Sequence, residues 1–381
     1  MAAKVRSPFW GNLRNRGRWH ILRALGYIPT QLHRKKFAIG IVKVDRLGDF
    51  VLATSAIRLL TERFGPENCL LIISPFAREI ASREFPDTPQ IVVPPFVAKK
   101  LRKIAPIWWQ QQSGAASYRF DHVVSFRHYP SIYRDALLSW LPTGAIHGLS
   151  GDPLAEFIGG KFPFNETLSY PQSADPSLSF DLEGYRLILE YILERKVTPD
   201  EVKPRLRSLK STPGGNLLVA PFASAKVKDY PTRLLIEALH QFQTENPLPI
   251  NIIVGPDQAE QLAAFEQQAR AANIAFESAR ICANLDDYFK TLASAKAILT
   301  MDSASTHLAG ALDKPVVTLL GGGHVRMFGP WWHSPDRQIW LRHDIACQNC
   351  NWTCTQPENY CLSRIAPTDV TAALHRVLAS D

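Results

Sequence analysis

Apolar residues follow two alternating patterns along this chain. Short runs rich in β-branched residues are typical of buried parallel strands, and apolar residues at every third or fourth position are typical of amphipathic helices. This alternation predicts a parallel sheet covered by helices. In the first half, the patterns predict strands at residues 37–44, 69–73, 91–93 and 122–126, and helices at residues 50–64, 76–83 and 131–141.

The alternation returns in the second half of the chain. Between the halves, residues 142–180 are rich in Gly, Pro and Ser and lack periodicity, so they are predicted to be a connector. Residues 198–215 contain three prolines and two adjacent glycines and form the predicted linker. The later patterns predict strands at residues 217–220, 250–254, 297–300 and 316–320, and helices at residues 182–196, 232–244 and 257–272.

The predicted fold class is α/β, with two Rossmann-like, doubly wound domains facing a central crevice. Ligands bind such domains outside the carboxyl ends of the strands, so candidate site residues are those that follow strands. The predicted parts are a basic N-terminal extension (1–36), a first Rossmann-like domain (37–197), the linker (198–215), a second Rossmann-like domain (216–365) and a C-terminal helix (366–381).

Composition is that of a globular protein. Of the 381 residues, 46% are hydrophobic and 20% are charged. No apolar run approaches the roughly 20 residues that span a bilayer, and the N-terminus lacks an apolar core followed by a small-residue cleavage site. We therefore expect a cytoplasmic protein.

The net charge of +8 is concentrated at the N-terminus. Residues 1–36 carry nine Lys or Arg and no acidic residue, so the rest of the chain has a net charge of −1. Interleaved aromatic and aliphatic residues suit an amphipathic segment on anionic lipid, which predicts a peripheral protein on the inner face of the inner membrane. A solvated extension is the alternative. Nucleic acid is not the expected partner, because no nucleic-acid-binding motif accompanies the basic residues.

Polar or glycine-rich loops follow five of the predicted strands. Asp49 follows the first strand, at a glycine turn that opens a helix. The three glycines at residues 321–323 lack the spacing of a dinucleotide-binding fingerprint, and neither a GxxxxGKS/T loop nor a glycine-flanked nucleophilic serine is present. The loops fit a phosphorylated or nucleotide ligand held by helix termini and lysine. The other loops contain Lys226, Lys228, Asp257 and Asp302.

The most informative loop is residues 302–315, DSASTHLAGALDKP. An apolar run precedes it, side chains suited to N-caps open it, and a short helix from His307 to Leu312 ends before Pro315. The free backbone N–H groups at such a helix start can hold an anion, typically a phosphate. An ordinary capped helix is the alternative interpretation.

Two longer motifs resemble those of a known family. Residues 43–60 (KVDRLGDFVLATSAIRLL) and 302–322 (DSASTHLAGALDKPVVTLLGG) resemble glycosyltransferase family 9, the ADP-heptose:lipopolysaccharide heptosyltransferases. The resemblance implies a GT-B fold, with an N-terminal acceptor domain, a C-terminal nucleotide-sugar domain and an inverting transfer that needs no catalytic metal. Three further blocks agree with it: the Lys-aromatic-Pro step at 228–231, the FGPWW run at 328–332 and the cysteine block at 347–361.

The resemblance implies roles for the strand-end residues. Asp49 would be the general base that removes a proton from the acceptor hydroxyl, with a helix N-cap as its structural alternative. Lys228 would bind the donor diphosphate, with Lys226 as its close competitor, because a fixed cation offsets the charge that builds on the leaving group. Asp302 would lie near the donor sugar.

The resemblance places the turn after Asp302 at the diphosphate. The family usually has glycine where Ala304 stands, and alanine would be strained if that position needs a positive φ. His307 would support the loop, although a buried core histidine is an equal interpretation. The implied donor-binding residues are Lys226, Lys228, Asp257, Asp302, Ser303, Ala304, Ser305 and His307.

Acceptor binding is expected in the first domain. Lys43 would sit near the phosphate or the acceptor, and Arg127, His128 and Arg134 resemble the positions where the family meets its acceptor. Residues 99–109, with four basic residues and paired tryptophans, would suit an anionic, lipid-linked saccharide, or would form a solvated basic helix.

Four of the six cysteines form a C-x2-C-x3-C-x6-C block. A cytosolic chain disfavours disulfides, so the clustering favours a structural metal site for zinc or iron. The spacing lacks the repeated CxxC pairs of zinc ribbons, which leaves metal-free thiols as the alternative. Protein-modifying members of the resembled family use such a block for iron. The block consists of Cys347, Cys350, Cys354 and Cys361.

The implied function is transfer of heptose from ADP-heptose to a lipopolysaccharide core acceptor. The expected partners are a nucleotide-sugar donor, an anionic lipid-linked saccharide acceptor and a membrane surface, with no cofactor required for the transfer. A protein O-heptosyltransferase and a non-catalytic nucleotide-binding module are the alternatives. The module would keep Asp302 and Lys228 but would not need Asp49.

Overall fold

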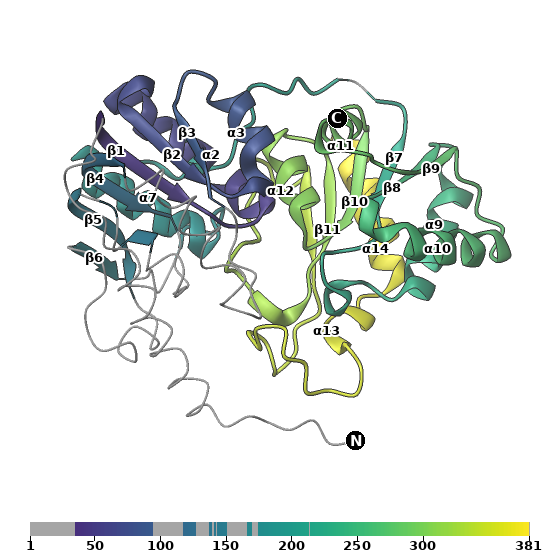
Figure 1. Ribbon diagram of the computed structural model, residues 1–381. Coiled ribbons are helices and arrows are strands. Elements are labelled where there is room, and N and C mark those ends of the chain that lie inside the picture. Colours follow the sequence, from purple (N-terminus) through teal and green to yellow (C-terminus); the bar gives the residue numbers. More distant parts are fainter. Residues whose placement is uncertain are drawn as a thin grey trace, which may run out of the picture. The chain divides into compact units, whose positions relative to one another are not determined.

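The computed structural model describes residues 35–93, 117–126, 137–138, 141, 143–150, 166–169, 174–212 and 214–380. The chain divides into two compact units, each with its own parallel sheet (Figure 1). Unit 1 comprises Met1–Arg46, Ala56–Ser173 and Glu183–Thr198, and unit 2 comprises Leu47–Ser55, Ala174–Leu182 and Pro199–Asp381.

Unit 1 contains a parallel sheet with the strand order β3-β2-β1-β4-β5-β6. This is the doubly wound order 3-2-1-4-5-6, in which ligands bind at the carboxyl ends of the first and fourth strands. The described strands are β1 (Lys35–Lys43), β2 (Cys69–Ile73), β3 (Gln90–Val92), β4 (Tyr118–Ser125), β5 (Thr143–Ser150) and β6 (Glu166–Ser169).

The central strands of unit 1 are buried on both faces. Ile39 and Ile41 of β1 have no exposed surface, and every residue of β2 is buried. Such strands need a continuous apolar run rather than alternation, which explains why the sequence predicted them. The described helices that accompany this sheet are α2 (Leu47–Phe64), α3 (Arg78–Glu84) and α7 (Phe180–Leu193).

Unit 2 contains a parallel sheet with the order β12-β11-β10-β7-β8-β9. Counted along the chain from β7, this is again the order 3-2-1-4-5-6, with β7 and β10 adjacent at the switch point. The strands are β7 (Leu217–Ala220), β8 (Ile250–Val254), β9 (Ser278–Ile281), β10 (Ala297–Met301), β11 (Val316–Leu319) and β12 (Gln338–Leu341).

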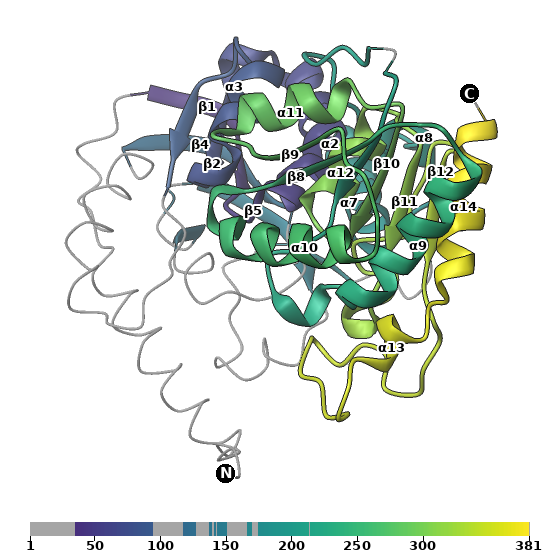
Figure 2. The ribbon, with the colours of Figure 1, turned by 90° about the vertical axis from the view of Figure 1, so that its right-hand side faces the viewer.

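Helices cover both faces of the unit 2 sheet. α9, α10 and α14 share a core with one face, and α12 packs on the other face beside α11 (Figures 1 and 2). The described helices are α8 (Pro199–Val202), α9 (Thr232–Glu245), α10 (Ala259–Ala271), α11 (Leu285–Ala293), α12 (Ala304–Ala311), α13 (Tyr360–Ser363) and α14 (Pro367–Ala379).

The predicted α/β fold with two doubly wound halves is confirmed. The prediction that residues 142–180 are only a connector is wrong, because β5 and β6 lie within them and α7 begins at Phe180. β6 is an edge strand of the sheet and β5 lies beside it, and the sequences of both contain polar or glycine residues in place of the apolar run that marks a central strand.

The predicted linker also differs from the structure, because residues from Pro199 onward belong to unit 2. α8 opens this stretch, and the backbone N–H of Leu206 donates to Ala311 O at 3.0 Å. The buried Lys314 ammonium donates to the carbonyl of Thr212 at 2.7 Å and to that of Ala295 at 2.7 Å. A proline-rich and glycine-rich stretch is thus fixed through its backbone to the end of α12 and to Lys314.

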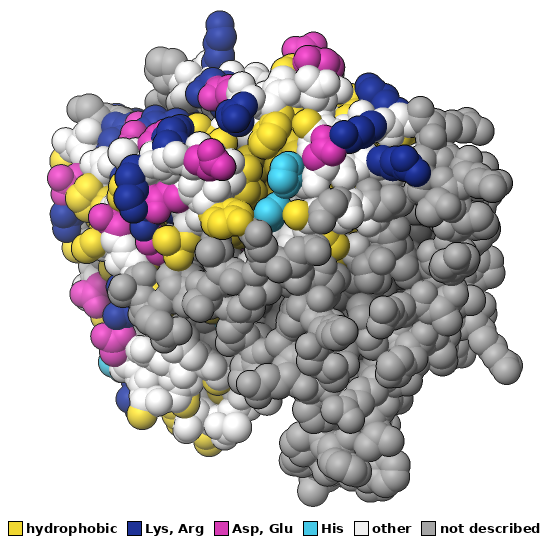
Figure 3. Space-filling model, turned by 90° about the vertical axis from the view of Figure 1, so that its left-hand side faces the viewer, with side chains coloured by type: hydrophobic (Ala, Val, Ile, Leu, Met, Phe, Trp, Pro, Cys, Tyr) yellow, Lys and Arg dark blue, Asp and Glu magenta, His cyan; other side chains and the backbone are white. Residues whose placement is uncertain are grey.

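Several predictions fall outside the described residues, including the N-terminal extension up to residue 34 and the basic segment 99–109. Among the residues that are described, no helix is long and apolar enough to cross a membrane. The described surface in Figure 3 mixes acidic and basic side chains without a patch of one sign.

Candidate functional site

Two polar side chains meet at the switch point of unit 2. The Lys228 Nζ atom lies 3.0 Å from Asp302 Oδ2, although 74 residues separate them in the sequence. Lys228 ends a short 3-10 turn after β7, and Asp302 follows β10 directly. Their side chains are 20% and 8% exposed, so the ion pair is shielded from solvent on most sides. The lysine and the aspartate predicted for the donor site are therefore neighbours.

Lys226 differs from Lys228 in its surroundings. It lies in the same turn, Lys226–Lys228, but its side chain is exposed, and the described ion pairs at Asp302 involve Lys228 alone. Asp257 is also exposed, in the turn Pro256–Gln258 after β8. No hydrogen bond or ion pair among the described residues joins Asp257 to Lys228 or Asp302. The geometry thus favours Lys228 over Lys226 and leaves Asp257 at the edge of the group.

The turn after Asp302 opens α12 with a side-chain cap. Ser303 is the N-cap, and its Oγ accepts a hydrogen bond from the backbone N–H of Ser305 at 3.3 Å. Ala304 is the first helical residue and is not among the described residues with positive φ. Alanine at this position is therefore unstrained, and the helix start is intact despite the departure from glycine.

Tyr288 of α11 supports this helix start from the side. Its hydroxyl is hydrogen-bonded to Ser305 Oγ, and burial raises the Tyr288 pKa to about 12, against the opposing effect of that hydrogen bond. The phenol is therefore protonated at neutral pH and can donate to Ser305. The apolar pattern does not predict helix α11, so Tyr288 cannot be identified from the sequence.

His307 is buried in α12 and is neutral. Its pKa is lowered to about 4, chiefly by burial; Asp302 and Asp181 act in the opposite direction and Lys228 in the same direction. Trp331 Nε1 donates to His307 Nδ1 at 3.2 Å. Because an indole N–H can only donate, Nδ1 is the acceptor and the proton sits on Nε2. The two predictions for His307, a residue that supports the loop and a buried core histidine, are therefore compatible.

Asp49 lies in the third position of α2, in its first turn. It is therefore not the N-cap residue, although a carboxylate in the first turn still stabilises the start of a helix. The preceding residue, Gly48, packs against α12 within unit 2: a Cβ at Gly48 would lie 3.1 Å from the His307 ring and 3.3 Å from Ala304 Cα. A larger residue would push the start of α2 away from the start of α12.

Lys43 does not have the surroundings of a ligand-binding lysine. Its side chain is 2% exposed, and Nζ lies 2.7 Å from Phe126 O, 2.9 Å from the Tyr185 hydroxyl and 3.1 Å from Asp45 Oδ2. These three acceptors use all three donors of an ammonium group. The geometry favours a structural role for Lys43. The other predicted acceptor residues, Arg127, His128 and Arg134, lie outside the described residues.

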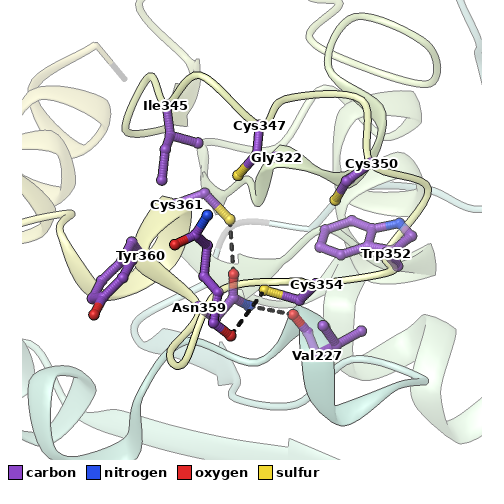
Figure 4. A pocket seen from close by; sticks show the side chains of 12 residues that line it. Val227, Gly322, Ile345, Cys347, Cys350, Trp352, Cys354, Asn359, Tyr360 and Cys361 are labelled. Carbon is purple, nitrogen blue, oxygen red and sulfur yellow. Dashed lines mark hydrogen bonds between the residues drawn. The ribbon is translucent and has the colours of Figure 1, made fainter. Parts of the chain in front are cut away.

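The four cysteines of the block line one pocket, together with Trp352 and Asn359 (Figure 4). Burial raises the pKa of Cys361, and the other three thiols of the block raise it further, while a hydrogen bond from Gly322 lowers it. Among the described residues, no group of three or more His, Cys, Asp or Glu is arranged closely enough to hold a metal ion. The donor set suits a thiophilic metal, but the thiols as placed surround the pocket without meeting at one point.

Sequence reasoning missed a buried carboxylate in unit 2. Asp181, in the first turn of α7, is 1% exposed, and its charge acts on His307. Its backbone N–H donates to Met327 O at 3.0 Å, which ties this segment to the turn before the FGPWW run. Asp181 lies between the predicted connector, which ends at residue 180, and the predicted helix, which begins at residue 182, so only its place beside a predicted helix start could have drawn attention to it.

Comparison with known proteins agrees with this geometry. Residues 191–359, which include most of unit 2, match the model of glycosyltransferase family 9 (heptosyltransferase). No curated protein sequence matches the chain. Among solved structures, the E. coli heptosyltransferase WaaC with ADP is 16% identical with a TM-score of 0.64, and the match covers 90% of this chain and 100% of that one.

Two further solved structures have the same fold. E. coli ADP-heptose LPS heptosyltransferase II is 19% identical with a TM-score of 0.57, covering 90% of this chain and 99% of that one. The iron-containing glycosyltransferase TibC from enterotoxigenic E. coli H10407 is 14% identical with a TM-score of 0.52, covering 91% of this chain and 78% of that one. At these identities the likeness establishes the fold.

The chain has two parallel-sheet α/β units, a GT-B-like fold that it shares with the solved heptosyltransferases. Its residues 191–359 are similar to glycosyltransferase family 9 (heptosyltransferase).

Proposed function

We propose that this protein transfers heptose from ADP-heptose to a lipopolysaccharide core acceptor. The observation that carries the proposal is the pairing of Lys228 with Asp302 at the start of α12, at the switch point of unit 2. Doubly wound sheets bind nucleotides at this point. WaaC, which shares the fold, was solved with ADP, and this supports a nucleotide-sugar donor here.

In this proposal the donor diphosphate lies between Lys228 and the start of α12. The free N–H groups at the helix start and the positive end of the helix dipole attract phosphate oxygens. The Lys228 ammonium offsets the negative charge that builds on the departing diphosphate. Asp302 shares that ammonium before the donor binds, and it is then placed to contact the donor sugar.

Asp49 is the proposed general base. It would take the proton from the acceptor hydroxyl as that oxygen attacks the anomeric carbon, with inversion at that carbon. Its place in the first turn of α2, directly after the glycine that packs on α12, supports this role. Charge stabilisation by Lys228 and the helix start would suffice without a cofactor for the transfer.

The acceptor is proposed to be an anionic saccharide linked to lipid. The nine basic residues among positions 1–36, interleaved with aromatic residues, support attachment to an anionic membrane surface where such an acceptor resides. A protein acceptor is the second candidate, which the four-cysteine pocket favours through the likeness to the iron-containing TibC.

We also propose that the cysteine block binds one zinc or iron ion with a structural role. Four thiols line one pocket, and the other three raise the cost of ionising Cys361. A bound cation would reverse that effect and draw the thiolates together. Cys347, Cys350, Cys354 and Cys361 would hold the ion and thereby fix the loop that carries them.

Replacing Asp49 with Asn tests the proposed function. Transfer of heptose from ADP-heptose to heptose-deficient lipopolysaccharide should fall by about a hundredfold or more, because general-base catalysis contributes about that much. ADP affinity, measured by calorimetry, should stay within about threefold of the unaltered protein, because Asp49 does not bind the diphosphate.

The matched control is Glu62→Gln, an identical change of charge at an exposed position of the same helix. It should leave both measurements unchanged. Full turnover by the Asp49→Asn protein would show that another group is the base, and retained ADP binding without turnover in the unaltered protein would favour the non-catalytic nucleotide-binding module.

A further inference from the structure

Lys228 has a second partner besides Asp302. Its Nζ atom lies 4.7 Å from the ring centroid of Trp352, over the indole face. Trp352 lies between Cys350 and Cys354, so the ring belongs to the cysteine block. An ammonium is attracted to the face of an aromatic ring. The cysteine block therefore contacts the predicted donor lysine directly.

Stacking on the glycine turn after β11 fixes the Trp352 ring. A Cβ at Gly321 would lie 2.7 Å from the ring and one at Gly323 would lie 2.2 Å from it, so only glycine leaves room for the indole. The backbone N–H of Asn351 donates to Gly323 O at 3.1 Å. Trp352 Nε1 is buried and has no hydrogen-bond partner among the described residues, so the ring face and not the N–H positions this side chain.

Asn359 makes a second link from the block to the lysine turn. Its Nδ2 donates to the carbonyl of Val227, the residue before Lys228 (Figure 4). Its Oδ1 accepts from the Cys361 thiol at 2.8 Å. One asparagine therefore joins a cysteine of the block to the backbone of the lysine turn.

From these contacts we infer that Trp352 and Asn359 are positioning residues that hold Lys228 in place for the donor diphosphate. Trp352 fixes the ammonium and Asn359 fixes the turn, so the cysteine block sets donor affinity through Lys228. This inference rests on the proposed function, in which Lys228 binds the diphosphate.

The physical reason lies in the flexibility of lysine. A lysine side chain has four rotatable bonds, and immobilising it when a ligand binds costs conformational entropy. An ammonium already held between a carboxylate and a ring face has lost that freedom before the donor arrives. The electron-rich ring also keeps the charge in place while phosphate oxygens replace part of its contact with Asp302.

A double-mutant cycle between Trp352 and Lys228 tests this inference. Trp352→Ala should weaken ADP binding, measured by calorimetry, about three- to thirtyfold, as expected for loss of a partly shielded cation–π contact. Trp352→Phe keeps an aromatic face and should restore most of the affinity. In a Lys228→Met protein, adding Trp352→Ala should weaken ADP binding by less than about a further twofold, because the effect of Trp352 passes through Lys228. Equal losses with and without Lys228 would overturn the inference.

The matched control is Tyr360→Ala, which removes another aromatic ring from the same pocket. The Tyr360 ring is paired with Arg364 and not with Lys228. ADP affinity should stay within about twofold of the unaltered protein. Asn359→Ala should weaken ADP binding in the same direction as Trp352→Ala, and an unchanged affinity would limit the inference to Trp352.

A nucleotide-free measurement separates this inference from the proposed function. Competitive acetylation with acetic anhydride, read at Lys228 by mass spectrometry, reports how freely its ammonium moves. Lys228 should react several-fold faster in Trp352→Ala and at the original rate in Trp352→Phe. If the unaltered protein does not bind ADP, the proposed function fails, and this labelling still decides whether Trp352 restrains Lys228. Unchanged labelling in Trp352→Ala would contradict the inference.

Discussion

His307 shows how burial selects one form of a side chain at this site. Its ring stacks on Trp331 with an interplanar angle of 12°, and the Trp331 N–H occupies Nδ1. A protonated ring would have to give up that hydrogen bond, because Nδ1 would then be a donor facing a donor. The neutral ring therefore carries its proton on Nε2 and adds no charge near the start of α12.

This burial makes the stability of the protein depend on pH. The folded pKa of about 4 lies below the ordinary 6.5, so between these values the unfolded chain binds a proton that the folded chain does not. The contribution of His307 to the free energy of unfolding is therefore fully present above pH 6.5 and falls by about 1.4 kcal/mol per pH unit as the pH drops towards 4. His307→Gln should remove this part of the slope in urea titrations between pH 7 and pH 4.5.

The control for that experiment is His240→Gln, on the exposed side of α9. The His240→Gln protein should keep the pH dependence of the free energy of unfolding that His307 contributes. A slope in His307→Gln equal to that of the unaltered protein would show that His307 is not the buried neutral group described here.

Lys43 and Lys228 show what sequence could and could not predict about the site. Both lysines come at or after strand ends, and both were predicted to bind ligand. Lys43 has three acceptors around its ammonium, whereas Lys228 has one carboxylate and one ring face. Strand ends can be located from apolar runs, but the partners come from distant parts of the chain, so their number could not be predicted.

At the scale of elements, the cysteine block is a short loop tied to two strand ends. It contacts the glycine turn after β11 through Trp352 and the lysine turn after β7 through Asn359. A loop with few apolar side chains gains little from burial, so metal ligation is a physically reasonable way to fix it. The block could be predicted from its cysteines. The contacts of Trp352 and Asn359 with the two turns could not be predicted from the sequence.

Metal analysis tests the block directly. The purified protein should contain about one zinc or iron per chain, and the double variant Cys350→Ser, Cys354→Ser should lose most of it, because two of four thiolate ligands are gone. Chelation should lower the unfolding temperature of the unaltered protein. The control is the Cys282→Ala protein, in which the replaced cysteine lies outside the block. This protein should retain the metal of the block. A metal content near zero in protein prepared without chelator would contradict the proposal.

Strand predictions succeeded where burial alone determines the sequence. β2, β7 and β8 have the predicted bounds, and all three lie inside a sheet and are apolar. β6, β9 and β12 are edge strands and were missed, because a strand with one partner needs fewer apolar residues. The packing of Gly48 on α12 was equally beyond prediction, since it joins segments more than 250 residues apart.

At the scale of the whole molecule, the chain repeats one strand order in two units. Although the two units share one fold, they have different residues at their switch points. Unit 2 has the Lys228–Asp302 pair and the start of α12, whereas the described residues of unit 1 at the end of β1 include the saturated Lys43. The difference supports assigning the donor to unit 2.

The most direct test of the central claim is calorimetric titration of the purified protein with ADP-heptose, ADP, UDP and UDP-glucose. We expect the adenosine ligands to bind at least about tenfold more tightly than the uridine ligands. We also expect Lys228→Met to weaken ADP binding about ten- to hundredfold, because it removes a charge-assisted contact to phosphate. Preference for the uridine ligands, or unchanged ADP affinity in Lys228→Met, would contradict it.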